Sequence, residues 1–150
     1  ERNTQQQARL EQVFYIHNGL SARLGGWAAF SSDFPTEWYG YGGLYLPLTS
    51  YLALEPSYYY GQDGFNSVNQ QRAVLAAKLL LPKGPEFTLG GFIGKADLGI
   101  EGVPDHISGG YLLALLPFTD WLSGQLAANY EKGNFAEATV VAAGLKFRFR

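Results

Sequence analysis

The feature that most constrains this chain is a series of short segments in which apolar and polar residues alternate. Alternation with a period of two is typical of β-strands whose two faces meet different surroundings. Clusters of glycine, proline, asparagine and aspartate separate the segments, as expected of turns. Eight segments of about 10–12 residues follow one another: 19–31, 37–46, 50–60, 70–81, 86–97, 106–117, 120–131 and 137–149. The sequence therefore predicts an all-β fold with eight antiparallel strands.

The composition indicates the kind of solvent such strands face. Charged residues make up 16% of the chain, against about 25% in an ordinary soluble domain, and aromatic residues make up 15%. The longest uninterrupted apolar run, Tyr111 to Phe118, is far shorter than the roughly 20 residues that a membrane helix needs. A closed β-barrel is the other structure that satisfies every backbone polar group in lipid. We therefore expect a transmembrane up-and-down barrel.

The connections between the segments alternate in length. The short ones are Pro47–Ser50, Pro82–Pro85 and Phe118–Asp120. The longer ones are Ser32–Thr36, Gly61–Asn69, Leu98–Asp105 and Lys132–Ala136. Short turns on one side and longer loops on the other are typical of membrane barrels. With eight strands, both chain ends would lie on the side of the short turns.

Aromatic residues gather near the ends of the segments. Those expected near the outer interface are Trp27, Phe30, Trp38, Tyr58, Tyr60 and Tyr130. Those expected near the inner interface are Phe87, Phe118, Trp121, Phe147 and Phe149. Aromatic rings also favour strands in general, but amphipathic rings concentrate at the headgroup depth of a bilayer. The distribution predicts two aromatic belts.

The polar faces of the segments carry mostly small residues and few charges, whereas a soluble barrel needs a well-solvated exterior. The charges on these faces have both signs: Arg23, Glu55, Arg72, Lys78, Lys95, Asp97, Glu131, Lys146 and Arg148. Buried charges are tolerated only when they are paired. We therefore expect a salt-bridged network that fills a narrow, mostly closed lumen.

Residues 1–18 form a separate N-terminal segment, and residues 19–150 form the barrel. Thr4-Gln5-Gln6-Gln7 is a possible start of a helix whose face of Leu10, Val13 and Phe14 would lie at the membrane surface or plug the barrel. Asn18-Gly19 is instead a hairpin signal, which would add a ninth strand and break the even count. We favour the short helix.

The eight alternating segments, the alternating connections and the final segment resemble the small eight-stranded outer-membrane barrels of bacteria. The final segment ends Leu145-Lys146-Phe147-Arg148-Phe149-Arg150, and the resemblance covers residues 19–150. It implies a location in the Gram-negative outer membrane, with the lipid bilayer and lipopolysaccharide as partners. Those barrels include adhesins, anchors, minor channels and lipid A modifying enzymes, so the fold does not select the function.

One pair of residues suggests catalysis. His106 and Ser108 share one face of a strand, where a base and a nucleophile would be neighbours. The lipid A deacylase barrels carry a similar His-x-Ser with an acidic residue, a role that the resemblance would give to Glu131 or Glu137. However, the pair opens the sixth segment rather than lying near the chain end, and Gly109 replaces the asparagine that follows the serine in that family. We therefore favour a protein that is not an enzyme.

Other ligand classes have little support. The net charge of −2 gives no basic footprint for nucleic acid. The chain contains no cysteine, and its two histidines, His17 and His106, do not make a metal site. We expect neither a cofactor nor a metal.

These observations favour a structural or interaction component, acting as an anchor, an adhesin or a member of a complex, with another envelope protein as a candidate partner. The longest loop, Gly61–Asn69, with Phe65 near its centre, is the expected contact surface. Three alternatives stay open: a narrow pore for small solutes, a lipid A modifying hydrolase that uses His106 and Ser108, and a soluble ligand-binding barrel.

Overall fold

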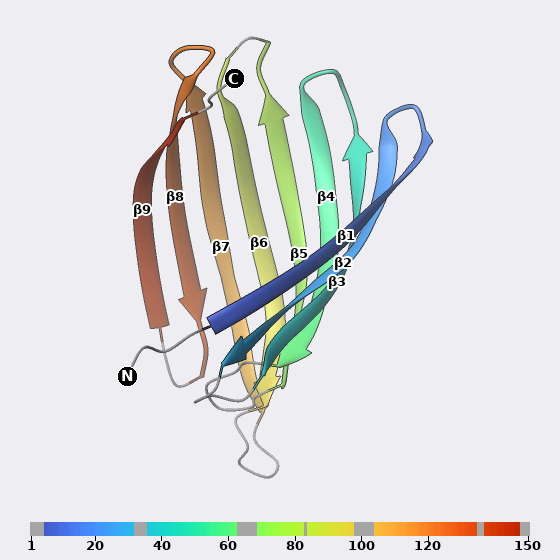
Figure 1. Cartoon of the computed structure of the whole chain (residues 1–150), viewed down its shortest axis with the longest axis vertical. Helices are drawn as coiled ribbons and strands as arrows, with labels where there is room; N and C mark the ends of the chain where they lie inside the picture. The colour runs from blue at the N-terminus through green and yellow to red at the C-terminus, as the bar shows by residue number, and fades with distance from the viewer. Residues whose placement is uncertain are drawn as a thin grey trace.

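The computed structural model describes residues 5–31, 36–62, 69–82, 84–97, 104–134 and 137–147. These residues form a single antiparallel sheet in which every strand pairs with the next one along the chain (Figure 1). Its strands are β1 (Gln5–His17), β2 (Leu20–Ser31), β3 (Glu37–Pro47), β4 (Leu52–Gln62), β5 (Asn69–Leu80), β6 (Glu86–Asp97), β7 (Pro104–Pro117), β8 (Leu122–Lys132) and β9 (Glu137–Phe147). Within these ranges there is no helix long and apolar enough to cross a membrane.

The all-β, up-and-down architecture predicted from the sequence is confirmed. Strands β2 to β9 correspond to the eight predicted segments, and each observed bound lies within two residues of its prediction. The expected alternation of the connections holds only in part, because the connections after β1, β3, β5 and β7 span two to five residues and the other four span four to six. The turns after β1, β3, β5 and β7 lie together at one end of the sheet, which we call the turn end (upper in Figure 1). The opposite end, where the other four connections begin and finish, is the loop end.

The predicted N-terminal helix is wrong. Residues 5–17 form β1, which pairs with β2 from Gln5 opposite Ser31 to His17 opposite Leu20. Asn18 and Gly19 connect the two strands with φ values of 50° and 79°. Two consecutive residues with positive φ are typical of a tight hairpin turn, and asparagine followed by glycine is the preferred pair. The local turn signal, supported by a ladder along the whole length of β2, therefore outweighs the helical pattern.

The ninth strand changes both ends of the sheet. With an odd number of strands, the first and last strands run in the same direction, and the chain ends lie at opposite ends of the sheet (Figure 1). The expectation that both ends lie on the side of the short turns is therefore wrong. Among the described strands, β1 and β9 each pair on one side only, so the sheet is open.

Two of the turns are built on the same plan. In the turn after β3, the hydroxyl oxygen of Thr49 accepts hydrogen bonds from the backbone N–H of Tyr51 at 3.1 Å and of Leu52 at 3.0 Å. Thr119 does the same after β7, accepting from Trp121 at 3.3 Å and Leu122 at 3.0 Å. In both turns, the backbone N–H groups of the threonine and of the residue before it also donate to the carbonyl of the leucine that begins the next strand. That leucine is Leu52 in the first turn and Leu122 in the second. The turns are thereby fixed without glycine, and Tyr51 and Trp121 remain exposed at the turn end.

The sheet curls, so it has a concave face and a convex face (Figure 1). Residues directly opposite each other in neighbouring strands share a face, and the register therefore assigns every side chain to one of the two. Most of the buried apolar residues of the concave face are alanines, and only two are larger. They are Ala29, Ala53, Ala76, Ala96, Phe92 and Ile107. No large side chain in the described ranges is completely buried. The described residues therefore form no aliphatic core of the kind that a soluble sandwich has.

Candidate functional site: two chemically different faces

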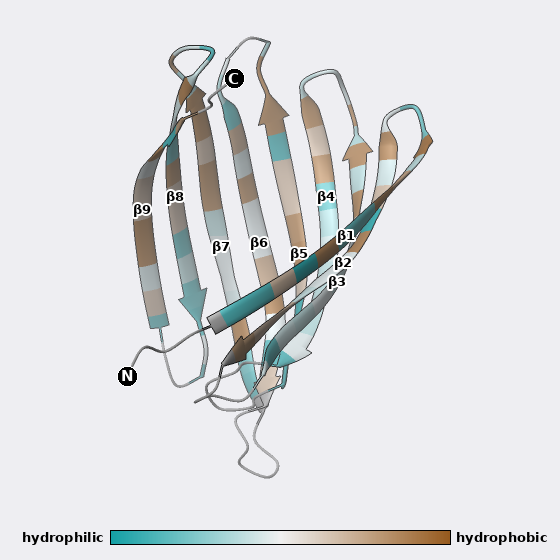
Figure 2. Cartoon of the chain, viewed as in Figure 1, coloured by the Kyte–Doolittle hydropathy of each residue, from teal (hydrophilic) through white to brown (hydrophobic). Residues whose placement is uncertain are grey.

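The convex face is apolar and exposed. Hydrophobic and hydrophilic residues alternate along the strands in Figure 2, because successive residues point to opposite faces. The exposed fractions of Leu89, Ile93 and Val141 reach 65%, 68% and 74%. The other large residues of this exposed face are Leu10, Phe14, Leu24, Phe30, Trp38, Leu44, Tyr58, Tyr60, Leu75, Leu79, Leu112, Leu126, Tyr130, Leu145 and Phe147. A soluble monomer rarely exposes a contiguous apolar patch of more than a few hundred Å², and such a patch marks a contact with a membrane, another protein or a ligand.

The predicted interface aromatics largely fall into two rows on this face. Trp38 and Tyr60 lie at the loop end with their ring centroids 5.7 Å apart in an edge-on arrangement. Trp121 and Phe147 stack at the turn end with centroids 6.3 Å apart. Tyr58 and Tyr130 extend the loop-end row, and Phe118 extends the turn-end row. Phe149 lies outside the described residues.

Trp27 does not belong to either row. It lies on the concave face, directly opposite Tyr39 in β3, and the two rings stack with centroids 5.4 Å apart. The sequence interpretation assigned it by its nearness to a strand end. The register instead places it on the face of Arg23 and Ala29, because these residues are separated from Trp27 by even numbers.

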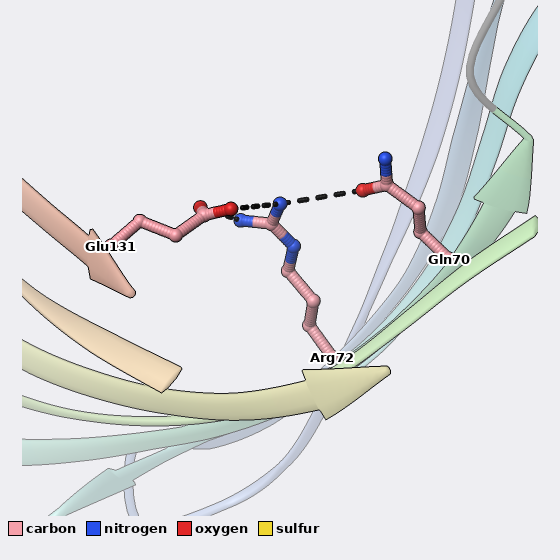
Figure 3. A network of polar contacts seen from close by, with 3 residues as sticks. All are labelled: Gln70, Arg72 and Glu131. Atoms are coloured by element: carbon pink, nitrogen blue, oxygen red, sulfur yellow. Dashed lines mark hydrogen bonds and ion pairs between the residues drawn. The ribbon is translucent and has the colours of Figure 1, made fainter. Parts of the chain in front are cut away.

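The concave face carries paired charges, and the clearest pair joins strands that are not neighbours. Arg72 of β5 contacts Glu131 of β8, with Nη1 and Oε2 2.9 Å apart, and its Nη2 donates to Gln70 at 3.3 Å (Figure 3). The guanidinium carbon also lies 5.2 Å from the centroid of the Phe92 ring. An Arg–carboxylate pair of this kind links the two halves of the concave face across β6 and β7.

Two glycines make this long-range pair possible. Gly94 lies directly opposite Arg72, and a Cβ there would come within 3.1 Å of Arg72 Cγ and 2.3 Å of a backbone oxygen. Gly109 lies directly opposite Phe92, and a Cβ there would come within 2.6 Å of the Phe92 ring. Glycine at these two positions leaves room for the arginine and the phenylalanine to lie flat over the sheet.

Three further ion pairs lie on the concave face. Arg23 contacts Glu55 at 3.5 Å across β3, and Lys78 contacts Glu86 at 3.6 Å. Arg9 contacts Glu11 at 2.9 Å, and the hydroxyl of Tyr41 donates to the same carboxylate. Side chains in the first two pairs are 25–44% exposed, so the network is partly solvated rather than sealed.

Only some of the residues expected in the charge network take part in these ion pairs. Arg23, Glu55, Arg72, Lys78 and Glu131 lie on the concave face in ion pairs. Lys146 lies on that face too, opposite Ser123, without an ion pair to a described residue. Lys95 was expected on the same face as these ion pairs, but it lies on the convex face with Ile93. The side chain of Asp97 and the whole of Arg148 lie outside the described part of the chain.

Some polar residues were missed by the sequence reasoning. Glu86 directly follows a short turn, and its role as the partner of Lys78 depends on a register that the sequence does not display. Glu11 was missed because its segment was expected to be helical. Asp105, expected at the end of the connection Leu98–Asp105, is buried and accepts a hydrogen bond from the backbone N–H of Asn134 at 2.6 Å. That contact fixes the chain after β8.

His106 and Ser108 do share a face, as predicted, but neither of the two acidic residues expected to complete a catalytic group lies beside them. Both are exposed on the convex face. Glu131, the first candidate for the acidic role, lies on the opposite face with Arg72. Glu137, the second, lies opposite Lys132, which separates it from Ser108 by one strand. The described residues also contain no group of three side chains able to hold a metal ion. The expected contact loop with Phe65 lies outside the described ranges at 63–68.

Comparisons with known proteins do not extend this picture. No protein-family model matches the chain, and no curated protein matches it. The chemistry of the two faces is therefore the basis for assigning a function.

Proposed function

We propose that this protein is a β-barrel of the bacterial outer membrane that acts as a non-enzymatic structural or interaction component. The observation that carries the proposal is the exposed apolar convex face with its two aromatic rows. Burying one leucine- or phenylalanine-sized side chain stabilises a protein by about 1.5–3 kcal/mol. A bilayer supplies that burial for the whole face, and headgroups accommodate the aromatic rows.

The concave face supports a closed lumen rather than a pore. Its large side chains stack in pairs, with the rings of Tyr41 and Tyr59 5.6 Å apart and those of Trp27 and Tyr39 5.4 Å apart. The pair of Arg72 and Glu131 adds a cross-link over the same space. Side chains that fill and bridge a small lumen interrupt a continuous water path through it, although parts of the face stay solvated. The narrow-pore alternative would require conductance in planar bilayers, which we do not expect.

The proposal requires the open sheet to close, because unpaired backbone groups are not tolerated in lipid. Strands β1 and β9 are the two edges, and both start at the loop end (Figure 1). Their pairing would be parallel, whereas bacterial barrels usually have an even number of strands and close in antiparallel fashion. We propose that β1 and β9 meet in this parallel arrangement.

Closure is testable by disulfide formation, because the chain contains no cysteine. Leu10→Cys is combined in turn with Val141→Cys, Ala143→Cys and Leu145→Cys, all on the convex face. One register should give an intramolecular disulfide, since paired strands bring Cα atoms within disulfide range. Disulfide-linked dimers, or no bond at any register, would contradict parallel closure.

Heat modifiability tests the proposed class of protein. The folded protein in detergent should migrate differently on a gel before and after boiling, and it should require detergent to stay in solution. Unchanged migration together with monodisperse behaviour in plain buffer would favour the soluble ligand-binding barrel instead.

A further inference from the structure

A groove on the convex face near the loop end combines apolar and polar side chains. It lies over β5, β6 and β7, has a volume of about 380 Å³ and is lined by Tyr58, Gln71, Ile93, Lys95, His106 and Ser108 among others. We call it the β5–β7 groove. Most of its lining is apolar, and the lysine, histidine, serine and glutamine side chains add hydrogen-bonding groups, so the groove fits an amphipathic occupant.

The charge of the groove is positive. Lys95 lies directly opposite His106, and Lys95 forms no ion pair with any described residue. No carboxylate lines the groove. Lys132, beside Ser108, adds a second cation next to the groove, although Glu137 lies on its far side. A cation that forms no ion pair with a described carboxylate is complementary to an anionic group at a membrane surface.

The hydrogen-bonding groups also favour an acceptor-rich ligand. The Tyr58 hydroxyl donates to Gln71 Oε1 at 2.7 Å, which leaves the Gln71 amide nitrogen available as a donor. The ammonium of Lys95, the hydroxyl of Ser108 and the ring of His106 provide further donors around the same groove. Phosphate oxygens accept hydrogen bonds and carry the opposite charge.

A pair of glycines adjoins the groove on the side of the turn end. Gly91 and Gly110 lie directly opposite each other on the convex face, one position beyond Ile93 and Ser108 in the direction of the turns. Leu75 and Tyr130 flank this glycine pair in the neighbouring strands. The pair carries no side chain, so the convex face is lower there than at its larger apolar neighbours, and we call this stretch the furrow.

We propose that the β5–β7 groove binds one anionic phospholipid. Its phosphate would face Lys95, with Ser108, His106 and Gln71 as hydrogen-bond donors, and the first carbons of one acyl chain would lie over Gly91 and Gly110. The proposal rests on the membrane location proposed above, because only a bilayer presents headgroup and chain together on this face. It places the loop end in the leaflet that holds phospholipid rather than lipopolysaccharide.

The test uses the whole protein in detergent, with lipid adducts counted by native mass spectrometry. Dioleoylphosphatidylglycerol and dioleoylphosphatidylcholine are titrated at equal concentrations. One basic residue near a membrane surface contributes about fivefold in affinity for an anionic lipid. We expect the first phosphatidylglycerol to bind at least about fivefold more tightly than phosphatidylcholine, and Lys95→Gln to abolish this preference. Lys146→Gln, which removes the same charge from the concave face, should leave the preference unchanged.

A second variant tests the furrow. A Cβ at Gly91 would have its nearest contact at 3.6 Å, an ordinary van der Waals distance, so Gly91→Val and the milder Gly91→Ala should keep the heat-modifiable fold. We expect Gly91→Val to weaken phosphatidylglycerol binding by several fold, and Gly91→Ala to weaken it less. Equal competition by soluble glycerol phosphate would overturn the lipid assignment in favour of a soluble phosphate compound.

The two proposals fail in different ways. Wild-type protein that does not float with phosphatidylcholine vesicles would contradict the membrane location, and the lipid site with it. Protein that floats and is heat-modifiable but binds both lipids equally, or loses the preference on Lys146→Gln as much as on Lys95→Gln, would overturn the lipid site alone.

Discussion

The two faces of the sheet are made by the same strands and differ in almost every chemical respect. On the convex face, large apolar side chains stand exposed and make few polar contacts. On the concave face, ion pairs, tyrosines and small residues fit together, with glycines where a larger side chain passes. A soluble β-protein buries its apolar face and solvates its polar one. In this protein the arrangement is reversed, because the apolar face is exposed and the polar face is on the inside of the curl. This reversal is the strongest indication that the convex face has an apolar solvent.

Leu112 and Leu113 give the sharpest comparison of the faces. They are adjacent in β7, they are exposed by 46% and 44%, and they point to the convex and concave faces respectively. Arginine at the bilayer midplane of a membrane barrel costs about 2–4 kcal/mol. We expect Leu112→Arg to destabilise the folded protein in lipid by roughly that amount.

Leu113→Arg is the matched control. Leu113 lies with Lys78, Glu86 and Gln125 around a concave pocket, where a guanidinium can be solvated or paired. Urea unfolding in vesicles should show a much smaller loss for this variant. Equal losses in the free energy of unfolding for Leu112→Arg and Leu113→Arg would mean that both faces meet the same solvent. That result would contradict the distinction between the two faces.

The adjacent glycines Gly90 and Gly91 test packing on the two faces. A Cβ at Gly90 would lie 2.3–2.7 Å from the ring and hydroxyl of Tyr111 on the concave face, whereas a Cβ at Gly91 meets only a backbone oxygen at 3.6 Å. Overpacking costs about 1–3 kcal/mol. We expect Gly90→Ala to lower the free energy of unfolding by about this amount, and Gly91→Ala to be nearly neutral. If urea unfolding showed Gly90→Ala to be as neutral as Gly91→Ala, the concave face would not be tightly packed around Tyr111.

The ion pair of Arg72 and Glu131 tests whether the concave charges stabilise the fold. Both side chains are about one-third exposed, so Glu131→Gln should cost about 1–2 kcal/mol, less than a fully buried pair. Glu11→Gln should cost less than Glu131→Gln, because Arg9 is 71% exposed and such exposed pairs contribute little. Urea unfolding of both variants checks the order. A smaller loss for Glu131→Gln than for Glu11→Gln would contradict a structural network.

The sequence was sufficient for the strands because a period of two repeats over every one of them. Leu122, Gly124, Leu126, Ala128 and Tyr130 alternate with polar neighbours, and all five lie on the convex face. The same signal was weak in residues 5–17, where three glutamines precede the apolar positions. There the Asn18-Gly19 pair predicted a hairpin and therefore a ninth strand, but the expectation of an even number of strands was given more weight.

The faces of individual residues and the partners of charges were harder to predict. Lys95 and Trp27 lie near strand ends, where polar and aromatic residues occur on both faces, so residue type alone misleads. The pair of Arg72 and Glu131 joins β5 to β8, and no local pattern encodes a contact across two intervening strands. Curvature of the sheet and the glycines beneath the arginine determine that contact.

The central claim is that the convex face contacts lipid and the concave face does not. Single cysteines at Leu89 and Leu145 on the convex face, and at Gln125 and Ala127 on the concave face, can each carry an environment-sensitive fluorophore, because the chain has no cysteine of its own. In vesicles, we expect a lipid-borne quencher to quench both convex labels strongly and both concave labels weakly. Equal quenching at all four positions, or stronger quenching of the concave labels, would contradict the account.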